Sequence, residues 1–226
     1  MTPTSTTSLA LDGAGIDGGL YTSITDFARD TRWLNGPMLT FTSIGVGLFA
    51  VFMLVGWWLA RKQDAAGMAT ALAAPVATVI AYLANATIKT VFTEPRPCRA
   101  LPHDFLIEKC PELNDYAFPS NHTTVVAAVT VALFLVNKRL GALSAVVAVV
   151  MGFSRVYVGA HYPHDVLVGA VVGAVVGAVC TLLARRFAAP LIERLRGGAL
   201  RPLLIAPTPG RRRAGRENSR AKRPVG

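Results

Sequence analysis

The amino-acid sequence predicts an all-α, polytopic membrane protein, a helical bundle with about five transmembrane helices. Hydrophobic residues make up 52% of the 226 residues and charged residues only 16%, and the mean hydropathy is +0.44. Between the charges lie apolar stretches close to the roughly 20 residues that a helix needs to cross a bilayer. The charges are also unevenly distributed, which separates an apolar body from a basic tail.

Residues 1–184 contain 11 Lys or Arg and 11 Asp or Glu, whereas residues 185–226 contain 12 and 2. The net charge of +10 therefore belongs to the C-terminal segment and indicates a cytoplasmic tail, partly disordered, that lies near anionic lipid headgroups. Nucleic-acid binding by this tail is the alternative, but no nucleic-acid partner is expected. The composition excludes a disordered body and a collagen-like repeat, and three cysteines are too few for a disulfide-rich miniprotein.

The predicted spans are apolar stretches between charged residues. The fourth span extends to Val158 if Arg155 lies at the membrane surface. The fifth span repeats glycine at every fourth position, which favours close packing of two helices within the chain. The five spans are Leu39–Ala60, Ala65–Ile88 with Pro75 inside it, Tyr116–Asn137, Leu140–Ser154 and Val166–Ala184.

Pairs of basic residues in short loops predict the orientation, because such loops lie on the cytoplasmic side. With five spans, the N-terminus is then outside and the C-terminus cytoplasmic, as expected in a bacterial-type plasma membrane. No cleavable signal peptide is expected, since a basic region followed by an apolar core is missing from the first residues. The basic pairs are Arg61–Lys62, Lys138–Arg139 and Arg185–Arg186.

Three regions are therefore expected along the chain. Residues 1–37 form an extracytoplasmic segment, in which residues 1–20 are disordered and Ile24–Leu34 forms a short surface helix. Residues 38–186 form the transmembrane domain that carries the site. Residues 187–226 form the basic cytoplasmic tail, with one short apolar stretch at Leu203–Ala206.

This topology places two loops outside, 91–121 and 154–165, and both are rich in polar residues. Lys89 lies at the end of the second span, and Arg96 follows between two prolines that fix the local backbone. The third span opens with Pro119, Ser120 and Asn121, so its unpaired backbone N–H groups face outward and form a ready anion site.

A histidine and a carboxylate then follow the fourth span. His161 and Asp165, four residues apart at a helix start, can form a hydrogen bond that fixes the imidazole tautomer and makes it a better nucleophile. Three cations, two histidines and one carboxylate therefore converge at the outer ends of neighbouring spans. They are Lys89, Arg96, Arg155, His122, His161 and Asp165. Phosphate is the ligand that fits this set.

Each residue taken alone has a simpler explanation. A Lys or Arg at a helix end is usually a membrane anchor, and a single His122 at a helix start would cap the helix or face water. His103 and His164 have no convergent partners in the sequence, so no role is assigned to them. The prediction therefore depends on the combination of spacings.

That combination resembles the three-part signature of the type 2 phosphatidic acid phosphatase (PAP2) family, which shares its site with vanadium haloperoxidases and bacterial acid phosphatases. The motifs extend over residues 89–165 and the pattern of spans over residues 40–184. The matching parts are Lys89-x6-Arg96-Pro97, then Pro119-Ser120-Asn121-His122, then Ser154-Arg155-x5-His161-x3-Asp165.

The resemblance implies a PAP2-like helical core and a site that needs no metal or other cofactor. It implies that His161 is the nucleophile that forms a phosphohistidine, that Asp165 orients it, and that His122 is the general acid. The phosphate-binding residues would be Lys89, Arg96, Ser120, Asn121 through its backbone N–H, and Arg155. The family usually has glycine at position 121; Asn replaces it at least cost if positive φ is needed.

The expected partners are a lipid phosphate substrate and the membrane, and the oligomeric state stays open. The span layout is similar to bacterial undecaprenyl diphosphate phosphatases of this family, which indicates that lipid as substrate. Phosphatidylglycerophosphate or phosphatidate is the alternative. A phosphotransferase would share the phosphohistidine, and a silent lipid-phosphate binder would share the cations but needs neither His161 nor Asp165.

Two of the three cysteines, Cys98 and Cys110, share the first outer loop. They can form a disulfide in an oxidising compartment or remain reduced. Cys180 lies in the fifth span. A zinc site is not expected, because the closely spaced cysteine pair typical of such sites is missing.

Overall fold

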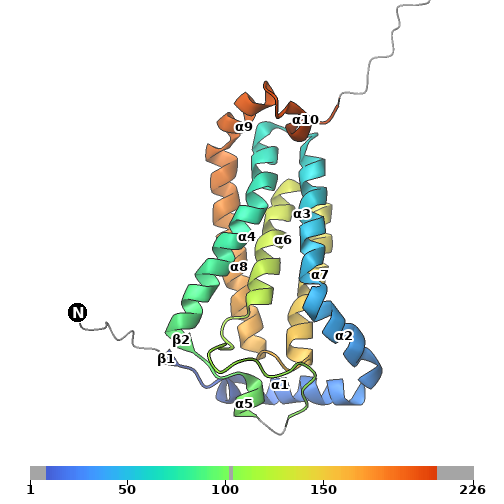
Figure 1. Ribbon diagram of the computed structural model, residues 1–226, viewed down its shortest axis with the longest axis vertical. Coiled ribbons are helices and arrows are strands. Elements are labelled where there is room, and N and C mark those ends of the chain that lie inside the picture. Colours follow the sequence, from blue (N-terminus) through green and yellow to red (C-terminus); the bar gives the residue numbers. More distant parts are fainter. Residues whose placement is uncertain (1–8, 102–103, 208–226) are drawn as a thin grey trace, which may run out of the picture.

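The computed structural model describes residues 9–101 and 104–207. Long helices run side by side along its long axis (Figure 1). Two short strands, β1 and β2, pair in parallel, with Leu9 opposite Phe92. The elements are β1 (Leu9–Ala10), α1 (Gly13–Asp30), α2 (Arg32–Ile44), α3 (Val46–Ala60), α4 (Ala65–Val91), β2 (Phe92–Thr93), α5 (Pro97–Ala100), α6 (Asn121–Val136), α7 (Lys138–Tyr157), α8 (Pro163–Phe187), α9 (Ala189–Arg196) and α10 (Arg201–Leu204).

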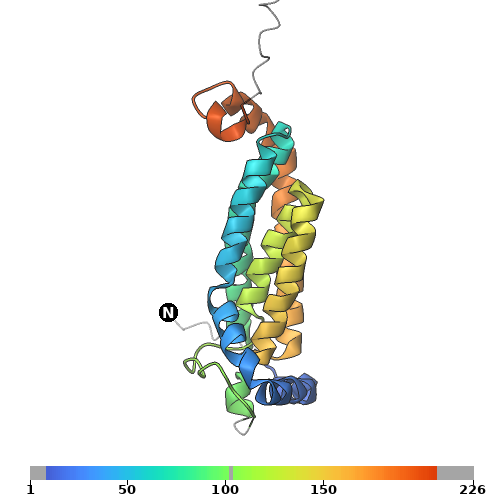
Figure 2. The ribbon, with the colours of Figure 1, turned by 90° about the vertical axis from the view of Figure 1, so that its right-hand side faces the viewer.

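Helix α6 is the central element of the bundle and contacts α3, α4, α7 and α8. Its buried residues include Val126, Val129 and Leu133, which pack with Phe49 of α3 and Met151 of α7. Helix α1 lies crosswise over one end of the bundle, and α9 and α10 lie at the other end (Figures 1 and 2). The bundle therefore has two distinct ends, each covered by its own terminal segment.

The helices α4, α7 and α8 are long and apolar enough to cross a membrane, and α2 with α3, bent by 53°, forms a fourth span if taken together. Helix α6 is apolar but has only 16 residues, which corresponds to about 24 Å. The predicted all-α membrane fold is confirmed, whereas the number of five spans stays a prediction. The third span was expected from Tyr116, but the helix begins at Asn121 because residues 116–120 form part of the preceding loop.

The first predicted span is not a single straight helix. The chain bends between α2 and α3, where Gly45 lies beside Met151: a Cβ added to this glycine would lie 3.1 Å from the methionine Cε. Pro37 lies inside α2, so the expected boundary of the N-terminal region at residue 37 falls within a helix. Hydropathy alone detects an apolar stretch and not the bend within it.

The expectation that residues 1–20 are disordered is wrong for residues 13–20, which belong to α1. Asp12 caps this helix by accepting a hydrogen bond from the Gly15 N–H at 3.1 Å. Tyr21 is fully buried and its hydroxyl donates to the carbonyl of Gly159 at 3.2 Å. The partner of Tyr21 is 138 residues away along the chain. The Gly-rich sequence around residues 13–20 therefore does not indicate that this segment is held in place. The expected surface helix Ile24–Leu34 is divided between α1 and α2.

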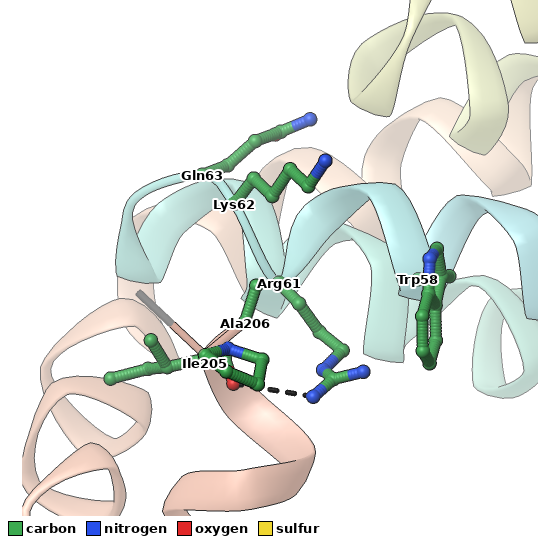
Figure 3. A pocket seen from close by; sticks show the side chains of 7 residues that line it. Trp58, Arg61, Lys62, Gln63, Ile205 and Ala206 are labelled. Atoms are coloured by element: carbon green, nitrogen blue, oxygen red, sulfur yellow. Dashed lines mark hydrogen bonds between the residues drawn. The ribbon is translucent and has the colours of Figure 1, made fainter. Parts of the chain in front are cut away.

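Part of the C-terminal tail is folded against the bundle. Ile192 and Leu204 are buried with Met68 of α4, and the guanidinium of Arg61 donates to the carbonyls of Pro202 and Ile205 at 2.8 and 3.4 Å. A hollow of about 650 Å³ lies between the end of α3 and the segment after α10. Figure 3 shows the guanidinium of Arg61 directed to the backbone of Ile205 in that segment. The arginine-rich residues 211–223 lie outside the described residues.

The glycine repeat of α8 packs against the backbone of α6, as the spacing predicts. A Cβ at Gly169 would lie 2.6 Å from the carbonyl oxygen of Ser120, and one at Gly177 would lie 2.8 Å from Cα of Ala128. Between them, a Cβ at Gly173 would overlap the carbonyl of Thr124. This close approach brings the N-terminal ends of α6 and α8 together.

We expect Gly173→Ala to lower the free energy of unfolding by about 1–3 kcal/mol, because the added methyl forces two backbones apart. Thermal unfolding of the detergent-solubilised protein measures the effect as a lower Tm. Gly19→Ala is the control, since a Cβ there meets nothing within 4 Å and alanine is the better helix former. A Gly173→Ala variant as stable as the wild type would contradict the backbone contact.

Candidate active site

Helices α4 and α7 end, and α6 and α8 begin, at the end of the bundle that α1 covers (Figure 1). The predicted site residues lie at or next to these helix ends. Lys89 lies in the last turn of α4, and Arg96 follows β2 in the next loop. Ser120 is the N-cap of α6, with Asn121 and His122 in its first turn. Arg155 lies in the last turn of α7. His161 precedes α8, and Asp165 lies in its first turn.

The His161 side chain is 2% exposed and lies between a carboxylate and a cation. Its Nδ1 is 3.3 Å from Oδ2 of Asp165, and its Nε2 is 2.9 Å from Nη1 of Arg96. A guanidinium can only donate, so Nε2 must accept and the ring proton must lie on Nδ1. Burial, and then the charges of Arg96 and Arg155, lower the pKa of His161 well below its ordinary value. The ring is therefore neutral, with its lone pair on Nε2, which is the nucleophilic form.

Asp165 joins the starts of two helices. Its side chain is fully buried, and Oδ2 also accepts a hydrogen bond from the backbone N–H of Tyr162 at 2.9 Å. Its backbone carbonyl accepts from the N–H of Ser120, the N-cap of α6, at 3.0 Å. The residue that holds His161 therefore also positions the predicted phosphate-binding turn.

The three cations are paired with two carboxylates of the loop between α5 and α6. Nη2 of Arg96 is 2.9 Å from Oδ1 of Asp115, and Nζ of Lys89 is 3.5 Å from the same oxygen. Arg155 makes a two-fold contact with Glu108, at 2.7 and 3.1 Å. Burial raises the pKa of Asp115, but the charge and hydrogen bond of Arg96 and the charge of Lys89 outweigh it and hold that pKa below its ordinary value.

The carboxylates of Asp115 and Glu108 therefore occupy the positions at which the oxygens of a bound phosphate would contact the cations. Their loop is fastened to the bundle: a disulfide joins Cys98 and Cys110, and the N–H of Glu108 donates to the carbonyl of Val158 at 3.0 Å. An anion that binds the three cations must displace Asp115 and Glu108 from them.

The first turn of α6 is held by α4. The side-chain oxygen of Asn121 accepts a hydrogen bond from Nδ2 of Asn85 at 2.6 Å, and the same nitrogen donates to the carbonyl of Pro119 at 3.1 Å. No residue other than glycine has positive φ in the part of the chain that the structure describes. Asn121 is thus an ordinary helical residue, and its backbone does not require the family's glycine. His122 is half-buried beside it.

Several contributors to the site were not expected from the sequence. Asn85 is a polar residue inside an apolar stretch, which is a recognisable sign of a functional or packing role. Asp115 and Glu108 carry no such sign. His164, to which no role was assigned, contacts Asp17 and Glu94. His103 lies outside the described residues.

We expect Asp115→Asn to bind inorganic phosphate about two- to fivefold more tightly, because it removes an anion that competes for the same cations. Isothermal titration of the detergent-solubilised protein measures the dissociation constant. Glu112→Gln is the control: it changes the net charge equally on the same loop, and this exposed side chain makes no ion pair among the described residues. Equal tightening in both variants would contradict direct competition.

Comparisons with known proteins identify the family of the chain. Residues 70–188 match the PAP2 superfamily. Undecaprenyl-diphosphatase BcrC of Bacillus subtilis is 30% identical over 148 residues, which cover 66% of this chain and 74% of that protein. An undecaprenyl-diphosphatase of Sulfolobus acidocaldarius is 36% identical over 95 residues, 42% of this chain and 45% of that one.

The crystal structure of LpxE from Aquifex aeolicus has a similar fold. It superimposes with a TM-score of 0.54 at 21% identity, over 76% of this chain and 96% of that chain. The family match extends over more than half of the sequence and contains all three motifs, from Lys89 to Asp165. The chain belongs to the PAP2 superfamily.

Proposed function

We propose that this protein is an integral-membrane lipid phosphatase that hydrolyses undecaprenyl diphosphate through a phosphohistidine at His161. The observation that carries the proposal is the placement of the buried His161, whose Nδ1 lies 3.3 Å from Oδ2 of Asp165 and whose Nε2 lies 2.9 Å from Nη1 of Arg96. The names of the relatives support a lipid diphosphate as the substrate. Mere binding of phosphate needs neither a buried nucleophile nor a carboxylate to orient it, which argues against a silent binder.

In the proposed first step, the N–H of Arg96 Nη1 moves its hydrogen bond from Nε2 of His161 to a phosphate oxygen. Nε2, now free, attacks the terminal phosphorus. The bond from phosphorus to the bridging oxygen breaks, and His122 donates a proton to the departing oxygen. The Nδ1 proton stays on the ring, where the Asp165 carboxylate stabilises the positive charge that the ring acquires. Lys89, Arg96 and Arg155 neutralise the charge on the non-bridging oxygens.

In the second step, water attacks the phosphohistidine and breaks its phosphorus–nitrogen bond. His122, now neutral, accepts the proton of that water, and inorganic phosphate and neutral His161 are restored. A phosphotransferase would use an alcohol in place of water, so the identity of the acceptor separates the two activities. All proton transfers are made by side chains of this chain, and the proposal requires no metal or other cofactor.

The position of the site supports an outward-facing lipid phosphatase. Lys138 begins α7 and Arg185 and Arg186 end α8, at the end of the bundle opposite to His161. Positive residues of this kind mark the cytoplasmic side, so the site would face outward, at the level of lipid headgroups. A phosphate that protrudes from the outer leaflet can then reach the cations while its hydrocarbon chain stays in the membrane.

We expect the purified protein to release phosphate from undecaprenyl diphosphate faster than from phosphatidylglycerophosphate or phosphatidate, with EDTA present throughout. His161→Ala removes the nucleophile and should abolish release, while the thermal unfolding temperature shows whether the fold is retained. Colorimetric phosphate determination measures the rate. Ordinary turnover by His161→Ala, or loss of wild-type activity in EDTA, would contradict the mechanism.

We also expect Asn121→Gly to change the rate by less than about tenfold, the scale of one lost hydrogen bond. The variant loses the contact with Asn85 but keeps the backbone N–H that is proposed to bind phosphate. Steady-state kinetics on the preferred lipid, beside Asn85→Ala as a variant that loses the same contact, measure the effect. A loss of several orders of magnitude in Asn121→Gly alone would show that the amide itself takes part in the reaction.

A further inference from the structure

A second group of charged residues lies behind the pair formed by His161 and Asp165. His164 is at its centre: Nδ1 is 2.8 Å from Oδ1 of Asp17 in α1, and Nε2 is 3.1 Å from Oε2 of Glu94 in the loop after β2. The same Nε2 is 3.6 Å from Oδ1 of Asp165. The backbone N–H of His164 also donates to Asp17, at 2.7 Å.

These contacts require His164 to be an imidazolium. Both ring nitrogens lie at hydrogen-bond distance from carboxylate oxygens, which only accept, so both nitrogens must carry a proton. Histidine with two carboxylates is also a donor set for a metal ion, but a metal ligand must offer a free lone pair. The ring lies between the aromatic rings of Phe118 and Tyr162, at centroid distances of 5.9 and 5.7 Å.

The positive charge is needed because two carboxylates are buried together. The side chains of Glu94 and Asp165 are both fully buried, and Oε1 of Glu94 and Oδ1 of Asp165 have no hydrogen-bond partner among the described residues. Two neighbouring carboxylates without solvent cannot both stay ionised unless a cation compensates them. Arg96 is directed to His161 and Asp115 instead, so His164 is the cation that contacts both.

We infer that His164 is a positioning residue, whose imidazolium keeps Asp165 ionised beside Glu94 so that Asp165 can hold the Nδ1 proton of His161. Asp17 fixes the ring through two contacts and so links α1 to the catalytic pair. The effect on turnover rests on the proposed function, whereas the balance of charge between these buried groups does not.

The first test is His164→Gln, which keeps a hydrogen-bond donor but removes the charge. We expect kcat to fall with KM unchanged, and the acid limb of the pH profile of kcat to move upward by about 1–3 pH units. The charged groups that face this position are Asp17 from α1, Glu94 from the loop, and Asp165 and Arg96 on the side of the catalytic pair. Wild-type kcat and an unshifted profile would overturn the inference.

The second test separates charge from structure. Glu94→Gln removes the competing carboxylate, so the double variant His164→Gln with Glu94→Gln should recover kcat and the wild-type pH profile. Glu94→Gln alone is the matched control and should be close to the wild type. A double variant no better than His164→Gln alone would overturn the inference, because a damaged fold is not repaired by a further substitution.

The third test does not depend on turnover. Infrared difference spectroscopy at pH 8, where the wild-type Asp165 is ionised and His164 is still charged, detects the carbonyl band of a protonated buried carboxylic acid. We expect no band in the wild type, a band in His164→Gln, and none in the double variant. If no lipid is hydrolysed, the proposed function fails while this measurement still decides the charge balance. A missing band in His164→Gln, or a band with unchanged kcat, would overturn the inference.

Discussion

The geometry of the site depends on Asp165, because this one residue determines the relation between α6, α8 and His161. Its carboxylate holds the imidazole and the N–H of Tyr162, while its carbonyl receives the N–H of Ser120. Such contacts are possible only if the two helices approach closely at their N-terminal ends. The glycines of α8 allow this approach along the whole contact with α6. The packing of the membrane-spanning part therefore determines how His161 is aligned with the first turn of α6, which is proposed to bind phosphate.

Charge balance is the second constraint, since the site concentrates cations in a largely buried place. Arg96 and Arg155 are each 5% exposed and Lys89 is 11% exposed, and buried charges are stable only with partners. Without a ligand, the partners are Asp115 and Glu108, on a loop held by a disulfide. A phosphate bound as proposed would exchange one set of anionic oxygens for another, so the cations would keep a counter-charge. The same carboxylates then become free to pair elsewhere or to face water.

The sequence was sufficient to predict an all-α membrane bundle and the gathering of the motif residues at one of its ends, because these depend on local hydropathy and fixed spacing. It was not sufficient where a contact joins distant parts of the chain. His164 looked isolated because its partner Asp17 is 147 residues away. Residues 13–20 of α1 were expected to be disordered because the contact that anchors this helix, from Tyr21 to Gly159, also joins distant parts of the chain. The start of α6 at Asn121 was missed for another reason: hydropathy does not distinguish an apolar loop from the first turn of a helix.

The two oxygens of the Asp165 carboxylate thus have different partners. Asp165 faces His161 with one oxygen, and His164 lies 3.6 Å from the other. The N-terminus of α8 adds a positive potential at the same place, because unpaired N–H groups carry the positive end of the helix dipole. Arg96 is a third source of positive potential, on the far side of His161. Since three sources share the stabilisation of Asp165, each of them contributes a graded effect. The nucleophile proposed here, His161, would have no such substitute, and this difference separates a positioning residue from a catalytic one.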